Sequence, residues 1–235
     1  MGDAALIDWQ GVVRARGGGF RLEVPELTIR PGDQLALVGP SGSGKSTCLD
    51  MLALSLAPDQ QQRMMMNGAT DLGALWQGGR SRALAALRAR HLGYVLQTGG
   101  LAPFLSLYEN AMLSRRLLGM KGPGPVRELA GRLGIADLMQ RKPRAVSIGE
   151  RQRAAVLRAL AHGPDLLLAD EPTASLDQSN AEAVVDLMSE MARESGTALV
   201  LVTHDPSLGV RIGAEQITCR HDPATRTSTI VRQAV

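Results

Sequence analysis

The chain has 235 residues, of which 44% are hydrophobic and 21% charged, with 26 basic side chains against 23 acidic ones. This composition predicts a globular protein with one large core, and its evenly mixed charges exclude a basic stripe for nucleic acid. No segment approaches the roughly 18 consecutive apolar residues of a membrane span. The opening residues MGDAALIDWQ lack the basic and apolar regions of a signal peptide, so we expect a soluble cytoplasmic protein.

A glycine-rich loop follows the apolar run QLALV at 34–38, which is typical of a buried strand. The loop reads GPSGSGKST and satisfies the pattern G-x-x-x-x-G-K-[ST]. Between a strand and a helix, its backbone N–H groups converge on phosphates at the positive end of the helix that begins near Lys45. We expect Lys45 to reach the β- and γ-phosphates and the Ser46 hydroxyl to ligate Mg²⁺. The predicted nucleotide-binding residues are Gly39, Pro40, Ser41, Gly42, Ser43, Gly44, Lys45, Ser46 and Thr47.

Two amphipathic helices are predicted in the middle of the chain. Residues 81–90 carry Leu84 and Leu87 on one face and basic side chains on another, and they lead into the segment GYVLQ that ends at Gln97. Residues 126–140 follow the break PGP at 123–125 and form the second helix.

An acidic pair ends a second apolar run. Residues 166–169 read LLLA, typical of a fully buried parallel strand, and Asp170 and Glu171 follow, with Pro172 ending the ladder. Carboxylates at this end of a strand lie where α/β sheets bind their ligands. We expect Asp170 to hold Mg²⁺ mostly through water and Glu171 to polarise the water that attacks the γ-phosphorus.

The order of these motifs with three further ones carries a family resemblance. VSIGERQR at 146–153 opens a helical stretch to about Ala161, ASLD follows the acidic pair, and VTHD contains His204. Over essentially residues 4–220, the set resembles the ATP-binding-cassette (ABC) ATPases, and ADEPTASLD at 169–177 is its most diagnostic string. The resemblance implies ATP as substrate and Mg²⁺ as its cofactor.

The resemblance also assigns roles to single residues. Gln97 would touch Mg²⁺ and the attacking water, and His204 would grip the γ-phosphate and orient Glu171. Taken singly, each residue is more often structural, Gln97 as an amide at a strand end and His204 as a core histidine, but their placement at predicted strand ends favours the functional roles. The resemblance implies a head-to-tail homodimer in which each chain contributes to the ATP site of its partner. The contributing residues would be the signature residues Ser147, Gly149 and Glu150 together with Asp177.

Two positions depart from the family pattern. Ile148 stands where the signature has its first glycine, and a β-branched residue resists positive φ and adds bulk beside phosphate. We therefore expect a slowed or partner-dependent ATPase. The aromatic residue that usually stacks on adenine aligns with Arg16, which can itself stack on a base. Phe20 is the alternative, although its position suggests the first small sheet.

The family plan implies an α/β fold: a P-loop NTPase core with a mostly parallel sheet, a small antiparallel β subdomain and a helical subdomain. The antiparallel part would comprise residues 5–27 and a strand and turn at 64–68. The helical subdomain would span about 101–145 of a single domain covering 1–235, and strands at 215–221 and 228–231 would close the sheet. Cys48 and Cys219 match no metal or redox spacing and are expected to be reduced.

A lone cassette without membrane spans resembles the energy-coupling subunit of a transporter. The segments around 101–111 and 141–153 resemble the lipoprotein-releasing and macrolide-efflux ATPases. This implies a separate integral membrane permease with a periplasmic domain as partner, and a location on the inner face of the cell membrane. The alternative is a regulatory or signalling ATPase that controls a membrane partner without transport. A nucleic-acid-processing cassette is disfavoured, because no basic stripe is present.

Overall fold

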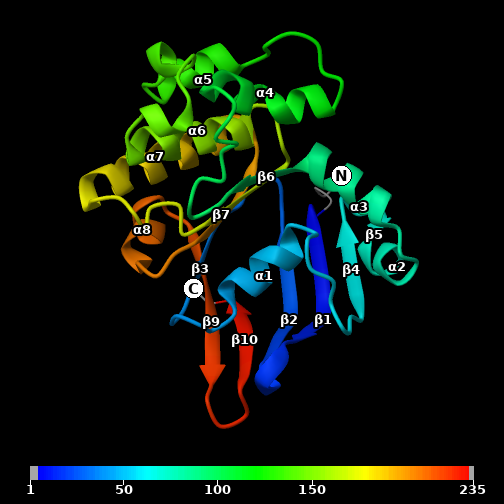
Figure 1. Cartoon of the computed structure of the whole chain (residues 1–235). Helices are drawn as coiled ribbons and strands as arrows, with labels where there is room; N and C mark the ends of the chain where they lie inside the picture. Colours follow the sequence, from blue (N-terminus) through cyan, green and yellow to red (C-terminus); the bar gives the residue numbers. More distant parts are fainter. Residues whose placement is uncertain (1–4, 233–235) are drawn as a thin grey trace.

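One mixed sheet, with helices on both faces, contains the parallel strands expected for the core (Figure 1). The computed structural model describes residues 5–232, where ten strands lie in the order β5-β4-β1-β2-β10-β9-β3-β8-β7-β6. The strands are β1 (Ile7–Ala15), β2 (Arg21–Ile29), β3 (Gln34–Val38), β4 (Arg63–Met66), β5 (Thr70–Asp71), β6 (Leu92–Val95), β7 (Leu166–Asp170), β8 (Ala198–Val202), β9 (Glu215–Asp222) and β10 (Thr227–Arg232). The helices are α1 (Lys45–Leu52), α2 (Leu72–Gln77), α3 (Ser81–His91), α4 (Leu107–Leu117), α5 (Val126–Arg132), α6 (Ile148–Leu160), α7 (Gln178–Glu194) and α8 (Pro206–Arg211).

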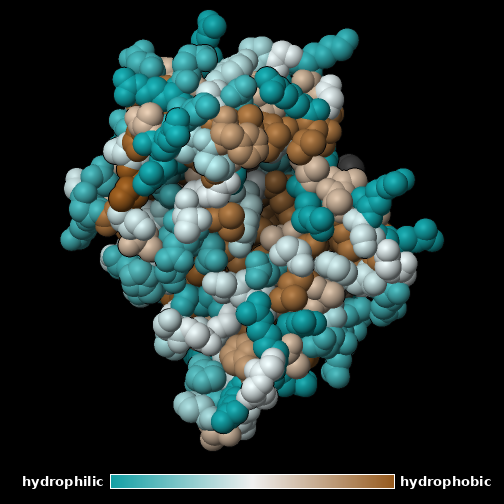
Figure 2. Space-filling model, viewed as in Figure 1, coloured by the Kyte–Doolittle hydropathy of each residue, from teal (hydrophilic) through white to brown (hydrophobic). Residues whose placement is uncertain are grey.

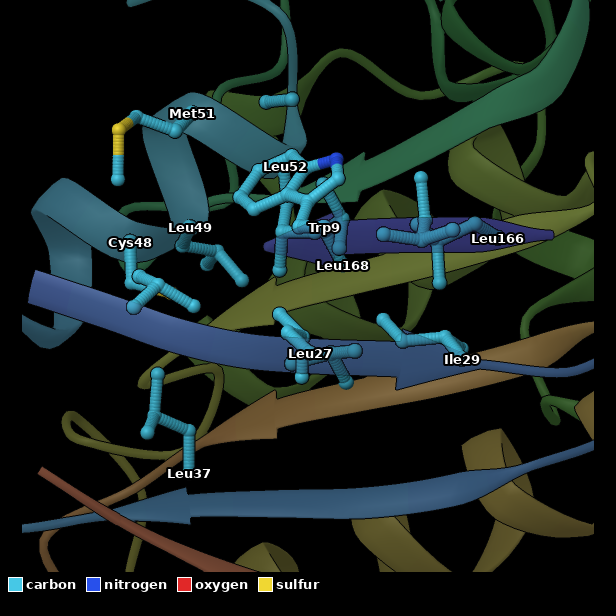
Figure 3. Close-up of a cluster of buried hydrophobic side chains, with 14 of the residues drawn as sticks. Trp9, Leu27, Ile29, Leu37, Cys48, Leu49, Met51, Leu52, Leu166 and Leu168 are labelled. Atoms are coloured by element: carbon cyan, nitrogen blue, oxygen red, sulfur yellow. The ribbon is translucent and has the colours of Figure 1, made fainter. Parts of the chain in front are cut away.

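The strands β9, β3, β8, β7 and β6 run parallel, and the central strands β3, β8 and β7 are buried on both faces. β3 pairs with β8 and β9, and β7 pairs with β8 and β6. Along β7, Leu166 and Leu168 belong to one core and Leu167 to the other. A strand covered on both faces needs apolar residues at every position, which explains the runs LLLA and ALVLV. Figure 3 shows the first core, where Trp9 of β1 and Leu52 of α1 meet the leucines of β7.

The strands β1, β2, β4 and β5 form the antiparallel part. β1 pairs with β2 and β4, and the predicted turn at Asn67 and Gly68 joins β4 to β5. The predicted closing strands are confirmed as β9 and β10. These two strands also connect the two parts of the sheet, because β10 pairs antiparallel with β9 and parallel with β2. The segment before β2 is thereby brought beside the core strands.

The helices between β6 and β7 in the chain gather at the top of Figure 1, where α4 and α5 lie above α6. The predicted helix over 81–90 is confirmed as α3. The prediction of one helix over 126–140 is wrong: α5 ends at Arg132, Gly134 has φ 65°, and Ala136–Leu138 form a separate 3-10 turn. A left-handed residue ends an α-helix, so one apolar pattern spans two elements.

Both cysteines are buried and unpaired, and burial raises the pKa of the Cys48 thiol to about 12. Within residues 5–232, no helix is both long and apolar enough to cross a bilayer. The domain span of 1–235 and the helical-subdomain limits of about 101–145 stay predictions, and residues 1–4 and 233–235 lie outside the described part of the chain.

Candidate nucleotide site

The carboxyl ends of four parallel strands meet along one edge of the sheet. Val202 at the end of β8 pairs with Leu37 of β3 on one side and with Asp170 of β7 on the other. The glycine-rich loop follows β3, His204 follows β8, and Gln97 follows β6. The predicted residues from four separate segments are therefore presented along the same edge, which is where α/β sheets bind ligands.

The loop at 39–47 wraps around the buried amine of Lys45. This side chain is 5% exposed, and its Nζ donates to the carbonyl oxygens of Gly39 at 2.8 Å and Pro40 at 2.9 Å. Gly44 caps α1 with φ 100°, and a Cβ there would lie 2.8 Å from the Phe20 ring. The sequence pattern requires glycine at this position because the backbone is left-handed and the ring is close.

An oxygen pair suited to a magnesium ion joins α1 to β7. Ser46 Oγ lies 3.3 Å from Asp170 Oδ1, and burial raises the pKa of the Asp170 carboxyl above its ordinary value, while the Ser46 bond opposes this shift. Hydroxyl and carboxylate oxygens are the hard donors that Mg²⁺ prefers, and a cation would offset the cost of burying this charge. The described residues contain no cluster of three or more His, Cys, Asp or Glu side chains that could hold a metal ion. Ser46 and Asp170 fit an ion that is also held by nucleotide phosphates.

Glu171 is held in an unusual backbone conformation beside His204. It has φ 44°, and its N–H donates to the Val202 carbonyl at 3.0 Å. A left-handed non-glycine residue costs on the order of 1–3 kcal/mol and tends to occur at functional positions. The carboxylate Oε2 lies 3.6 Å from His204 Nδ1. This separation is that of an ion pair and is longer than a hydrogen bond, and it places the imidazole next to the carboxylate.

Arg16 and Phe20, the two candidates for stacking on adenine, both line a cavity of about 430 Å³. The glycine-rich loop lines the same cavity. Arg16 forms an ion pair with Asp50 of α1, with Arg16 Nη2 3.7 Å from Asp50 Oδ2. The ring of Phe20 stacks on His221 of β9, with the centroids 6.2 Å apart and the planes at 25°. Phe20 directly precedes β2, a strand of the antiparallel part of the sheet.

The signature residues begin α6. Ser147 caps the helix: its Oγ accepts from the Glu150 N–H at 3.3 Å, and Glu150 Oε2 accepts from the Ser147 N–H at 2.7 Å. The Ser147 backbone bond holds the pKa of the Glu150 carboxyl below its usual range. Ile148 is the first residue of α6 and is not among the left-handed residues, so its β-branched side chain meets no positive φ at this position. Its side chain is 48% exposed, so only its bulk at the surface distinguishes it from glycine.

Asp177 caps α7 in the same way, accepting from the Asn180 N–H at 3.0 Å. In the part of the chain that the structure describes, no hydrogen bond or ion pair joins Ser147, Gly149 or Asp177 to the glycine-rich loop. The structure therefore divides the predicted residues into two sets. One set is assembled around Lys45, and the other lies at the exposed starts of two helices.

Two residues near these sets had not been predicted. His221 supports the Phe20 ring, and Arg158 of α6 bonds to the turn that contains Gln97. The sequence offered no signal for His221, which is remote from the loop along the chain. Arg158 could have been suspected from its place on the helix that the signature opens.

Comparisons with known proteins agree with this geometry. Residues 22–174 match the family model described as ABC transporter. The chain is 39% identical over 194 residues to the lipoprotein-releasing system ATP-binding protein LolD of Paramagnetospirillum magneticum, covering 81% of this chain and 83% of the relative. It is 39% identical over 219 residues to LolD of Legionella pneumophila, covering 90% and 93%.

Solved structures show the same fold. The dimeric bacterial ABC transporter cassette MJ0796 superposes with a TM-score of 0.75 at 27% identity, over 90% of this chain and 93% of that one. A post-hydrolysis dimer of the same cassette, bound to ADP and Pi, gives 0.70 at 26% identity, over 97% and 100%. The chain belongs to the ABC transporter family of ATPases. Its predicted fold class and its assignment as an ATPase are confirmed.

Proposed function

We propose that this chain is the Mg²⁺-dependent ATPase subunit of a lipoprotein-releasing transporter. It acts as a head-to-tail homodimer on the inner face of the cell membrane and is coupled to a separate permease with a periplasmic domain. The division of the site carries this proposal: Lys45, Asp170 and Glu171 lie together, whereas Ser147 and Asp177 lie apart at exposed helix starts. A second copy, turned head to tail, supplies the missing set. The names of the LolD relatives support the transporter type.

The proposed chemistry distributes the work among the strand ends. The loop N–H groups and Lys45 bind the phosphates. Ser46, Asp170 and Gln97 would hold Mg²⁺, which would supply positive charge for the γ-phosphate oxygens. Glu171 accepts a proton from the water whose oxygen bonds to the γ-phosphorus as the bond to the leaving oxygen breaks. His204, 3.6 Å away, orients the Glu171 carboxylate. Each of these groups acts from the edge described above.

The proposed docking surface for the permease lies on the helical lobe. Figure 2 shows hydrophobic side chains gathered on the upper part of the molecule, over and just below α4. Phe104 is 72% exposed and precedes α4, whose surface also exposes Leu113 and Leu117. Leu107 and Arg115 of the same helix are buried and belong to the interior of the lobe. An exposed aromatic side chain of this kind is typical of an interface anchor.

We expect Phe104→Asp to abolish co-purification of the membrane partner while ATP binding stays unchanged. A carboxylate at the centre of an apolar contact is desolvated without a counter-ion, which weakens association strongly. The test is a pull-down from detergent-solubilised membranes, with mass spectrometry of the bound permease. Val210→Asp, on an equally exposed apolar residue of α8, is the matched control. A Phe104→Asp variant that retains the permease as well as Val210→Asp does would refute this docking surface.

We expect Ile148→Gly to raise basal turnover with a change in unfolding free energy of no more than about 1 kcal/mol. The side chain is half exposed at the start of α6, so its removal leaves no cavity, but it relieves crowding beside Ser147 and Gly149 in the dimer. Steady-state ATPase rates and thermal unfolding measure the two effects. Ile148→Leu keeps the bulk and serves as the control. If the glycine variant turns over no faster than the leucine variant, the side chain does not crowd the partner's phosphates.

A further inference from the structure

Arg158 of α6 holds the backbone of the turn that contains Gln97. Its guanidinium Nη2 donates to the carbonyl of Gly99 at 3.2 Å and to that of Tyr94 at 3.4 Å, and Nη1 donates to the carbonyl of Gly100. One of these carbonyls precedes Gln97 in the chain and two follow it. A guanidinium presents five donors in a rigid plane, so one side chain can fasten both ends of the turn.

The same face of α6 packs along this turn. Gln152 Nε2 reaches the Leu96 carbonyl at 3.5 Å, two turns of helix before Arg158. A Cβ placed on Gly99 would lie 3.5 Å from Gln152 Oε1 and 3.6 Å from the Ala155 Cβ. The turn therefore rests on α6 without a gap, and Arg158 contributes the directional bonds.

Arg158 has no carboxylate partner among the described residues. Burial alone lowers the pKa of its guanidinium, and no acidic group contributes to the shift. A half-buried cation bonded only to carbonyl oxygens does not form an ion pair, so its role lies in the backbone that it holds. Arg115 provides a comparison, because it is buried and bonds to the carbonyls of Ala161 at 3.1 Å and Gly122 at 3.4 Å, outside the turn.

We propose that Arg158 is a positioning residue for Gln97, which fixes the Gln97 turn to the helix that Ser147 begins. The turn and the start of α6 then move as one unit, so that movement of α6 changes the place of Gln97 at the sheet edge. This inference rests on the proposed role of Gln97 at Mg²⁺ and the attacking water.

The experiment compares Arg158→Met, Arg158→Lys and the control Arg115→Met, with Arg158→Met also made in a Gln97→Ala background. We expect Arg158→Met to lower kcat about ten- to hundredfold, since a misplacement near 1 Å costs up to about that much. Its ATP dissociation constant stays within about threefold, because the loop contacts are intact. The Mg²⁺ concentration for half-maximal rate rises. Lysine keeps the positive charge but lacks the planar set of N–H donors, so we expect the kcat of Arg158→Lys to lie between those of wild type and Arg158→Met.

Hydrogen exchange of the nucleotide-free protein gives a readout that does not depend on turnover. Amides at 96–101 exchange faster in Arg158→Met than in wild type, whereas Arg115→Met leaves them unchanged and lowers only the melting temperature. If Arg158→Met does not fold, Arg158→Lys carries the same comparison.

The two proposals fail in different ways. Full turnover in Gln97→Ala refutes the proposed role of Gln97. Positioning of Gln97 by Arg158 then has no catalytic consequence. If Gln97→Ala is slow, Arg158→Met must not slow it further. An equal fractional loss in both backgrounds, or exchange at 96–101 unchanged from wild type, overturns the role of Arg158 alone.

Discussion

Glu171→Gln is expected to reduce hydrolysis by about 10²- to 10⁴-fold, the range typical of removing a general base, while ATP binding is kept. The substitution preserves the shape of the side chain and its place next to His204, but an amide cannot accept the proton of the attacking water. ATP then remains between the two subunits, so the variant accumulates as an ATP-bound homodimer.

The measurement combines steady-state phosphate release with size-exclusion light scattering in Mg-ATP. Glu190→Gln is the matched control: Glu190 is an exposed acid of α7 whose Oε1 pairs with Arg132 NH2 at 3.0 Å, away from the sheet edge. Hydrolysis and mass should follow wild type in this control. A Glu171→Gln variant that stays monomeric at micromolar concentration with saturating Mg-ATP would count against the head-to-tail dimer.

Lys45→Ala is expected to weaken ATP binding by about 2–5 kcal/mol, the cost typical of removing a buried charged partner. The Lys45 amine lies within the loop, 2.8 Å and 2.9 Å from two carbonyl oxygens, so alanine removes the positive charge that the loop encloses. Titration with a fluorescent ATP analogue measures the loss, which corresponds to at least roughly a thirtyfold higher Kd.

Lys121→Ala is the control for Lys45→Ala, since Lys121 is an exposed lysine of the segment between α4 and α5. Its affinity should equal that of wild type. A Lys45→Ala variant that folds and binds ATP as tightly as Lys121→Ala would show that the loop does not bind phosphate through this amine.

Local patterns in the sequence were sufficient to predict the core of the fold. The runs at 34–38 and 166–169 predicted strands that β3 and β7 confirm, because a strand buried on both faces must be apolar throughout. The glycine-rich loop and the acidic pair could be placed at strand ends, because each motif directly follows its strand in the chain.

The end of a helix was less predictable than its existence. The apolar spacing continues over 126–140, but the helix does not. α5 ends at Arg132, and the left-handed backbone of Gly134 prevents its continuation. At Ile148 the family pattern has a glycine, and the capping box of Ser147 and Glu150 places the isoleucine in the first turn of α6. Backbone conformation there follows from hydrogen bonds that composition alone does not specify.

The sequence by itself determined the family, the motifs and the strands that carry them, because each of these depends on residues adjacent in the chain. Only the tertiary structure decided which motifs share a site. Pairing of β10 with β2 and β9 brings His221 beside Phe20, whose ring lies against Gly44, and packing of α6 on β6 brings Arg158 to the Gln97 turn. Such contacts join segments far apart in the chain, and they exist only once strand order and helix packing are set.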